Sequence, residues 1–373
     1  MTRFLHTSDW QLGMTRHFLG EDAQPRFTQA RFDAIRRIGD LAVEHGAEFV
    51  VVAGDVFETN QVSRATVART LEALKAVAVP VFLLPGNHDP LDAASVFQRP
   101  HFKQNQPDHV VVLNDEAPRP ATEGVEVVGA PWRSKRPLSD LVADLVEGLE
   151  PAPGTLRIAV GHGACGEVAP ALGQVGLIDT ALVEAALADG RIHYLALGDR
   201  HSTTAIGATG RIAYSGAPVA TDYVEDAPNN VLLVECTAER CTTTPLHVGR
   251  WRFDVVEEDL IGEEPTADLQ ARLDAFDDKA RTVIKLKLTG TVTVRQAAAL
   301  ERLLDDQRDV FAALEAPERH RHVAVVPDDA DFADLQLGGF AAQALAALEQ
   351  RVESEPAARD ALALLWRLGG GQS

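Results

Sequence analysis

Five short apolar runs in this chain each end in polar side chains that are able to bind a metal ion. In chain order, the segments are LHTSDWQLG (5–13), VVAGDVFE (51–58), LLPGNHD (83–89), AVGHGA (159–164) and LALGDRHS (195–202). Ligands of open α/β sheets bind beyond the carboxyl ends of the strands. We therefore expect these strand ends to converge on one site.

The side chains at these strand ends are carboxylates, carboxamides and imidazoles, with hardly any Lys or Arg among them. The candidates are Asp9, Gln11, Asp55, Asn87, His88, Asp89, His162, Asp199 and His201. A single His after a strand, or a Gly-Asp pair in a turn, is more often structural. Together, however, converging carboxylates repel one another unless a cation lies between them. Two metal ions bridged by a carboxylate, a clamp suited to phosphoryl displacement, account for the set.

The spacing of the apolar runs predicts the fold class. Helical patterns at 26–46 and 63–77 alternate with strand-like runs; Gly46 is suited to end the first helix and Ser63 to cap the second. Further strands are expected at 48–54, 79–86, 109–114, 125–131, 156–163, 193–199, 211–216 and 230–236. Short β-branched runs that are apolar on both faces indicate an α/β sandwich with mixed sheets.

The sequence pattern changes near Trp251, and this change predicts a second domain. An acidic connector at 257–268 precedes a strand at 282–292, a helix at 295–315 and a strand at 321–329. We expect a core domain over 1–250, a small α/β cap over 251–330 and C-terminal helices over 331–373.

The segment 340–368 is expected to form two helical pieces, broken near Pro356. Its apolar positions are Leu345, Leu348, Val352, Leu362, Leu365 and Trp366. Such stripes serve either packing against the cap or docking of a partner, and packing is the usual case.

Composition limits the class of function. A formal net charge of −20 argues against a broad nucleic-acid patch, although it does not exclude an enzyme acting on phosphates. Basic residues near the predicted site give modest support for DNA contact: Arg16, His17, the RSKR run at 133–136 and Arg200. The three cysteines, Cys165, Cys236 and Cys241, have no CxxC spacing and predict reduced thiols. No signal peptide or membrane span is recognisable, so we expect a cytoplasmic protein.

The motif series resembles the calcineurin-like metallophosphoesterases. HTSDWQLG, AGDVFE, PGNHD, YLALG and YSGAP, spread over residues 5–218, resemble the SbcD family of DNA-repair nuclease subunits. The resemblance implies a four-layer α/β sandwich with a small α/β cap, acting as a metal-dependent exonuclease or endonuclease on DNA. It also implies a coiled-coil ATPase of the SbcC type and a second copy of the chain as partners.

The resemblance further implies a role for each candidate residue. One metal ion would be held by Asp9, Gln11, Asp55 and His201, and the other by Asp55, Asn87, His162 and Asp199. A hydroxide bridging the two ions would be the nucleophile. His88 would lie beside the scissile phosphate, and Asp89 would orient its imidazole.

Two of these ligands depart from the family pattern. Gln11 stands where the family's D-x-H motif has His, and Asp199 stands where its GH-x-H motif has the first His. Each change replaces an imidazole by an oxygen donor. Because oxygen donors suit Mn²⁺ and Mg²⁺ better than Zn²⁺, we expect two Mn²⁺ ions, with Mg²⁺ as the alternative.

Two other functions stay open at this point. A cyclic-nucleotide or other small-molecule phosphodiesterase would keep the metals and change the substrate, and the acidic charge slightly favours it. A partly inactive interaction subunit of an SbcC-like ATPase complex is suggested by the substituted ligands.

Overall fold

The computed structural model describes residues 1–167, 177–262, 264–326, 338–351, 355, 357–358, 361–362 and 364–365. The chain divides into two compact units. The first comprises Met1–Arg16 and Gln24–Trp251, and the second comprises His17–Ala23 and Arg252–Ser373. Within the second unit, the Phe18 ring lies edge-on to Phe253 with centroids 6.3 Å apart, which ties the early segment to the last third of the chain.

The first unit is built on two sheets. Its strands are β1 (Thr2–Thr7), β2 (Val50–Val52), β3 (Val81–Leu83), β4 (Val110–Val112), β5 (Arg119–Thr122), β6 (Val125–Gly129), β7 (Leu156–His162), β8 (Tyr194–Gly198), β9 (Thr204–Ile206), β10 (Ile212–Tyr214), β11 (Asn230–Cys236) and β12 (Cys241–His247). Within the described residues they form two six-stranded sheets, ordered β12-β11-β1-β2-β3-β4 and β5-β6-β7-β8-β10-β9. Both sheets are mixed: β1, for example, is parallel to β2 and antiparallel to β11.

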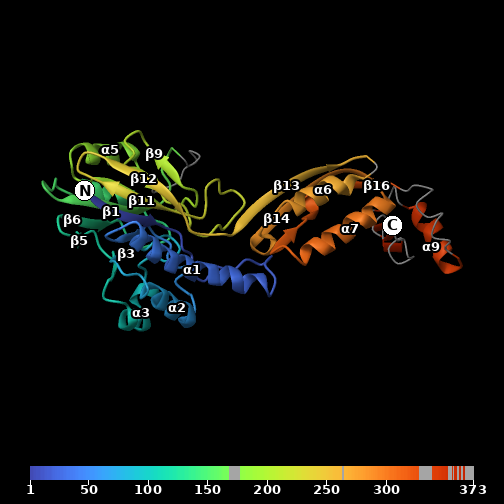
Figure 1. Cartoon of the computed structure of the whole chain (residues 1–373), viewed down its shortest axis with the longest axis horizontal. Coiled ribbons are helices and arrows are strands. Elements are labelled where there is room, and N and C mark those ends of the chain that lie inside the picture. The colour runs from blue at the N-terminus through green and yellow to red at the C-terminus, as the bar shows by residue number, and fades with distance from the viewer. Residues whose placement is uncertain are drawn as a thin grey trace. The chain divides into compact units, whose positions relative to one another are not determined.

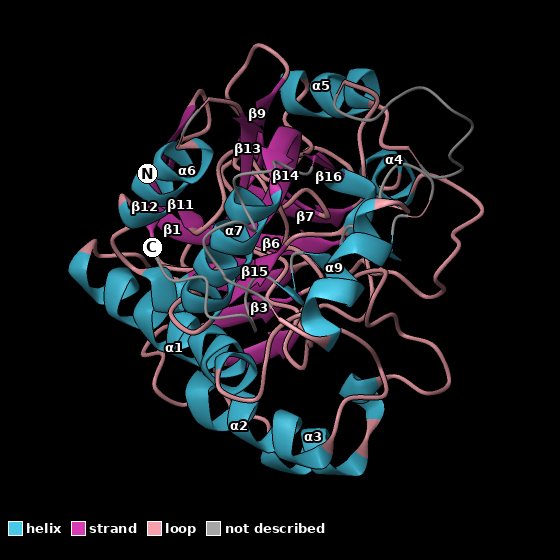
Figure 2. Cartoon of the chain, turned by 90° about the vertical axis from the view of Figure 1, so that its right-hand side faces the viewer, coloured by secondary structure: helices cyan, strands magenta, loops and turns pink. Residues whose placement is uncertain are grey.

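Helices cover the outer face of each sheet. Helices α1 (Ala23–Glu44), α2 (Arg64–Leu74) and α3 (Pro100–Asn105) lie at one side of the strands and α4 (Leu141–Glu147) and α5 (Thr180–Ala188) at the other, as the two views show (Figure 1, Figure 2). Alternation along β2 fits this arrangement, because Val50 and Val52 belong to the core beneath the first helices, and Val51 belongs to the core between the sheets. The predicted four-layer α/β sandwich is confirmed.

Local signals in the sequence account for the helix ends. Helix α1 ends two residues before Gly46, whose φ is 62°, a conformation that suits glycine. Helix α2 begins directly after Ser63, whose hydroxyl accepts a hydrogen bond from the Thr66 N–H at 3.0 Å. Both predictions are confirmed.

The strands β5, β9 and β12 were not predicted from the sequence. Strand β12 is polar and largely exposed, and it contains Pro245. It lies at the edge of its sheet, where a missing N–H and a polar surface are tolerated. Neither feature produces an apolar run, so a periodicity argument cannot find such a strand.

The expectation of three free thiols is wrong for one pair. Cys236 and Cys241 lie opposite each other in the β11–β12 hairpin, with Cα atoms 4.1 Å apart, and form a disulfide. The hairpin register brings together two cysteines whose spacing does not match a familiar motif. Cys165 is free and buried.

In its described residues, the second unit is a four-stranded sheet with helices. Its elements are β13 (Arg252–Leu260), α6 (Pro265–Asp274), β14 (Thr282–Thr293), α7 (Val294–Arg308), β15 (Ala313–Glu315) and β16 (Arg321–Val326). Strand β14 is parallel to β13, β15 and β16. The predicted acidic connector is wrong, because β13 and α6 occupy most of it; Lys287 of β14 pairs with Glu257 at 2.6 Å. The predicted helix at 295–315 ends earlier, and β15 begins at Ala313.

The C-terminal stripe packs on the second unit. Within it, α9 spans Phe340–Glu349. Leu345, Leu348 and Leu365 lie against a buried cluster of Val294, Ala298 and Leu362, which supports packing as the role of these residues. Val352, Pro356 and Trp366, which belong to the same prediction, lie outside the described residues. Among the described helices, none has the length and apolar composition required to cross a membrane.

Candidate metal centre

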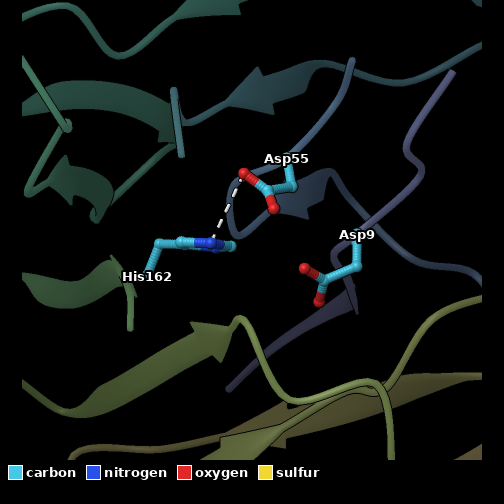
Figure 3. Close-up of side chains that lie close together, drawn as sticks. All are labelled: Asp9, Asp55 and His162. Carbon is cyan, nitrogen blue, oxygen red and sulfur yellow. Dashed lines mark ion pairs between the residues drawn. The ribbon is translucent and has the colours of Figure 1, made fainter. Parts of the chain in front are cut away.

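The predicted site residues converge at the carboxyl ends of the inner strands of both sheets of the first unit. Asp9 and Asp55 follow β1 and β2, and His162 is the last residue of β7. Each of these three buried residues offers a ligand atom, and the three atoms lie within 4.8 Å of one another. Figure 3 shows the two carboxylates and the imidazole pointing toward a common space, with His162 Nε2 3.4 Å from Asp55 Oδ1.

The remaining candidate ligands lie around this cluster. Asn87 Oδ1 is 2.9 Å and Asp199 Oδ1 is 3.8 Å from Nε2 of His162. On the other side, His201 Nε2 lies 3.8 Å from Asp9 Oδ1 and 3.3 Å from Nε2 of Gln11. The structure thus brings together all seven residues that the sequence proposes as ligands.

Several candidate ligands have a strained, left-handed backbone conformation, which directs their side chains toward the cluster. Five non-glycine residues among those described have a positive φ, and four of them are candidate ligands. These are Asp9 (52°), Gln11 (43°), Asp55 (54°) and Asp199 (92°). The left-handed region is unfavourable for residues with a Cβ, and such strain gathers at functional sites. Hydrogen bonds from the N–H groups of Asp9 and Gln11 to the carbonyls of Gly54 and Asp55, at 3.0 and 2.9 Å, hold the two loops together.

Two glycines leave the room that the ligands occupy. A Cβ at Gly54, where φ is 92°, would lie 2.1 Å from Nδ1 of His162. A Cβ at Gly86 would lie 2.2 Å from Oδ1 of Asp55. The glycines of the AGDVFE and PGNHD segments are therefore required by the close approach of neighbouring ligands.

In both His162 and His201, a hydrogen bond at Nδ1 leaves Nε2 available as a metal ligand. Nδ1 of His162 lies 2.8 Å from the Ala53 carbonyl, which only accepts, so Nδ1 carries the hydrogen. Nδ1 of His201 lies 2.9 Å from Oε1 of Glu225 and 2.7 Å from the Thr221 hydroxyl. A carboxylate or carbonyl behind the imidazole is the usual support of a metal-binding histidine.

The electrostatics of the site favour a cation. Burial raises the pKa of Asp9, against the opposing effect of the His201 and His162 imidazoles. At Asp55 burial is outweighed by His162, so the pKa of that carboxyl is lowered. Burial alone would lower the pKa of both imidazoles, yet Asp55 raises that of His162 well above its usual value, and the hydrogen bond to Glu225 raises that of His201 to about 9. The carboxylates therefore create a negative potential that stabilises positive charge.

The donor set fits divalent metal ions. It consists of ionisable carboxylates, carboxamides and imidazoles with Nε2 directed at the cluster. Oε1 of Gln11 is buried and has no hydrogen-bond partner among the described residues, which is costly unless a ligand satisfies it. A half-turn of the carboxamide exchanges its oxygen and nitrogen, so Gln11 is able to present oxygen toward Asp9 and His201.

His88 lies beside the cluster and is positioned by a residue other than the predicted one. Its Nδ1 is 2.9 Å from the Glu58 carbonyl, its Nε2 is 3.9 Å from Oδ2 of Asp55, and its side chain is 38% exposed. Asp89 is fully buried and accepts hydrogen bonds from the N–H groups of Gly86 (2.7 Å) and Phe57 (2.9 Å). The expectation that Asp89 orients the His88 ring is therefore wrong, because this carboxylate closes the turn that carries Asn87.

Four supporting residues were not predicted from the sequence. Glu58 stands inside a quoted motif, but its contact is through the main chain, which a side-chain pattern does not reveal. Glu225 and Thr221 lie in a loop without any motif. Trp132 donates its indole N–H to the His162 carbonyl at 2.8 Å. Its position just after the predicted strand at 125–131 is the only signal in the sequence that could have identified it.

Solved structures overlap weakly with this chain. A protein of Thermus thermophilus gives a TM-score of 0.41 at 12% identity, covering 65% of this chain and 98% of that one. Purple acid phosphatase PPD1 of yellow lupin gives a TM-score of 0.38 at 11% identity, covering 64% and 49%. Overlaps this low carry no weight for function.

Curated relatives are more informative. The chain is similar to the DNA double-strand break repair protein Mre11 of Haloferax volcanii, with 26% identity over 333 residues, which is 83% of this chain and 68% of that protein. Mre11 of Saccharolobus solfataricus is 27% identical over 134 residues, 35% of this chain, and Mre11 of Archaeoglobus fulgidus is 34% identical over 90 residues, 23% of this chain. These two alignments span only 33% and 19% of the relatives.

The family itself is shown by a match over most of the first unit. Residues 2–202, more than half of the chain, match the family described as Calcineurin-like phosphoesterase. Together with the Mre11 relatives, this match confirms the predicted resemblance and the prediction of a metal-dependent hydrolase of phosphate esters. The chain belongs to the calcineurin-like phosphoesterase family.

Proposed function

We propose that this protein hydrolyses phosphodiester bonds of DNA at a site for two divalent metal ions, Mn²⁺ first among them. The observation that carries the proposal is the convergence of all seven candidate ligands around the buried Asp9, Asp55 and His162. The similarity to proteins named for DNA double-strand break repair supports DNA as the substrate.

The residues would divide between two ions. Asp9, Gln11 and His201 would hold one ion, Asn87, His162 and Asp199 the other, and Asp55 would contact both. When bound, such ions activate water as a nucleophile and neutralise charge on the phosphate. The preference for Mn²⁺ or Mg²⁺ over Zn²⁺ rests on the oxygen donors of Gln11 and Asp199.

His88 would act on the substrate and not on the metal. Because the Glu58 carbonyl only accepts hydrogen bonds, the hydrogen of the neutral ring is on Nδ1 and Nε2 is free. In the protonated ring Nε2 donates, so it is able to stabilise the phosphate or give a proton to the leaving oxygen. Its partial exposure leaves room for a substrate.

The basic residues near the site differ in availability. Arg200 donates to the Thr204 hydroxyl at 2.8 Å, Arg16 donates to the Thr221 carbonyl at 2.8 Å, and Arg133 pairs with Glu116 at 3.1 Å. Lys135 and Arg136 are exposed, and no carboxylate pairs with them in the described part of the chain. These two cations are therefore the best placed of the RSKR run to meet a polyanion.

Cleavage assays with two substrates test the proposal. Purified protein in Mn²⁺ is incubated with linear duplex and single-stranded DNA and, in parallel, with bis-p-nitrophenyl phosphate. We expect metal-dependent cleavage of DNA that EDTA abolishes. Hydrolysis of the small ester alone would contradict a nuclease and favour the small-molecule phosphodiesterase; no hydrolysis of either would favour the inactive subunit.

The partners implied by the resemblance, a coiled-coil ATPase and a second copy of this chain, stay predictions. Co-expression with an ATPase encoded beside this chain tests the first, and light scattering of the purified protein tests the second. A stable ATPase complex and a dimeric mass are expected. A monomer that binds no such ATPase would contradict both.

A further inference from the structure

We propose that the pocket beside the metal centre holds one nucleotide of the DNA strand, its base against Trp132 and its phosphate at Lys135 and Arg136. The inference rests on the proposed function, because it assigns a place to a substrate of that class. It adds three recognition residues, Trp132, Lys135 and Arg136, that lie outside the metal-binding motifs.

The pocket opens directly onto the candidate metal centre. It has a volume of about 530 Å³, and its lining includes Asn87 and Asp199, two of the candidate ligands. A group bound in it therefore lies next to a phosphate held at the metals. The volume falls in the ordinary range for a site that binds a small molecule or a piece of one.

The wall away from the metals combines an aromatic and an aliphatic side chain with two cations. Trp132, Lys135, Arg136 and Leu138 all come from the loop between β6 and α4. Leu138 is 95% exposed, so its apolar surface has little to contact in the protein alone. Single-stranded nucleic acids are commonly bound by such a combination, bases stacking on aromatic rings while cations follow the phosphates.

Trp132 is fixed in place before any ligand binds. Its indole N–H donates to the His162 carbonyl at 2.8 Å, and the two rings meet edge to face with centroids 6.0 Å apart. Its main-chain N–H donates to the Pro85 carbonyl at 3.1 Å, and its own carbonyl accepts from the Leu91 N–H at 2.8 Å. Because the indole N–H is already used, the ring offers a π surface and no hydrogen bond, which suits stacking without base selectivity. A ring held in this way loses little conformational entropy on binding.

The two cations are available in a chain that is otherwise strongly acidic. The net charge is −20, and Arg133 of the same loop is paired with Glu116. Lys135 and Arg136 are exposed and line the pocket. In this loop, Arg133 is paired within the protein, whereas Lys135 and Arg136 line the pocket. Arg133 is therefore a matched control.

The test compares two ten-nucleotide strands of equal charge, oligothymidylate and a strand of abasic sugars, cleaved in Mn²⁺. We expect the wild type to show a higher kcat/KM on the strand with bases. Trp132→Ala should reduce that preference about tenfold, in the range of base stacking on an aromatic ring. Trp132→Phe should keep most of it. A merely structural role of Trp132 would lower both rates equally and leave the preference unchanged, which would overturn the inference.

The cations are tested by salt dependence. The double variant Lys135→Ala, Arg136→Ala should raise KM for both strands alike and lower the slope of log KM against log salt by about one unit. Arg133→Ala should keep KM within about twofold, since it does not line the pocket. An unchanged slope in the double variant would remove the phosphate part of the inference.

Failure of the inference is distinguishable from failure of the proposed function. A wild type that hydrolyses bis-p-nitrophenyl phosphate and neither strand would contradict a DNA substrate altogether. A wild type that cleaves both strands at the same kcat/KM would keep the nuclease and exclude the base pocket.

Discussion

Nε2 of His162 lies 3.4 Å from Oδ1 of Asp55, although Asp55 follows a strand of one sheet (β2) and His162 ends a strand of the other (β7). The pairing depends on the sandwich itself, because β2 and β7 must face each other for their carboxyl ends to meet. Ala53, two residues before Asp55, accepts the hydrogen bond from Nδ1 of His162 at 2.8 Å. One loop therefore both orients the imidazole and supplies the neighbouring carboxylate.

Removing the Asp55 carboxylate should abolish the stabilisation of the folded protein by bound Mn²⁺. A metal ion at 100 times its dissociation constant stabilises the native state by ~2.7 kcal/mol, which corresponds to a rise in Tm of ~5–10 °C for a domain of this size. We expect Mn²⁺ to produce such a rise in the wild type and almost none in Asp55→Asn, measured by differential scanning fluorimetry. Asp33→Asn, which changes an exposed acid paired with Arg36, is the control and should respond like the wild type. An equal rise in Asp55→Asn would place the metal elsewhere.

His88→Ala should separate metal binding from turnover. The ring is beside the cluster but held by the Glu58 carbonyl, so its removal leaves the proposed ligands in place. We expect metal content equal to that of the wild type and kcat reduced by ~10²–10⁴-fold, the usual contribution of a general acid or base. Metal analysis and Mn²⁺-dependent phosphodiester hydrolysis measure the two. Wild-type turnover would show that His88 has no part in the reaction.

Gly86→Ala should disturb the metal site without replacing any ligand residue. The added Cβ would lie 2.2 Å from Oδ1 of Asp55 and would displace it. We expect a loss of Mn²⁺ affinity of ~10–100-fold, as for other changes behind a metal ligand, measured by isothermal titration calorimetry. Gly166→Ala is the matched control, because a Cβ there meets no described atom within 4 Å. Similar affinities for the two variants would contradict the packing argument.

Gln11→His should move metal preference toward Zn²⁺. The buried Oε1 of Gln11 has no partner among the described residues, so the side chain is free to serve the metal, and an imidazole there suits Zn²⁺ better than an amide does. We expect the ratio of Zn²⁺ to Mn²⁺ affinity to rise by roughly tenfold. Competition titrations of both metals measure it in wild type and variant. An unchanged ratio would mean that Gln11 is not a ligand.

The site was more predictable from the sequence than its surroundings. Asp9, Asp55 and His162 are marked by apolar runs and glycines, since burial at a strand end leaves a pattern along the chain. Glu225 and the Glu58 carbonyl leave none, because their roles depend on how distant loops meet. The role predicted for Asp89 was wrong for the same reason. Asp89 follows His88 in the chain, but its carboxylate binds the main-chain N–H groups of Gly86 and Phe57 and not the His88 ring.

The fold shows a similar division. The inner strands of the sandwich are apolar on both faces and were found, whereas the polar edge strand β12 was not. In the second unit, Glu257 and its neighbours looked like a connector because they are acidic. Pairing with Lys287 on the adjacent strand is what makes this charge compatible with a sheet, and such pairing becomes visible only with the register.

Anomalous diffraction at the manganese edge, from crystals soaked in Mn²⁺, tests the central claim most directly. We expect two peaks, one among Asp9, Gln11 and His201 and one among Asn87, His162 and Asp199, with Asp55 in contact with both. A single peak, or peaks away from these residues, would contradict the two-metal site.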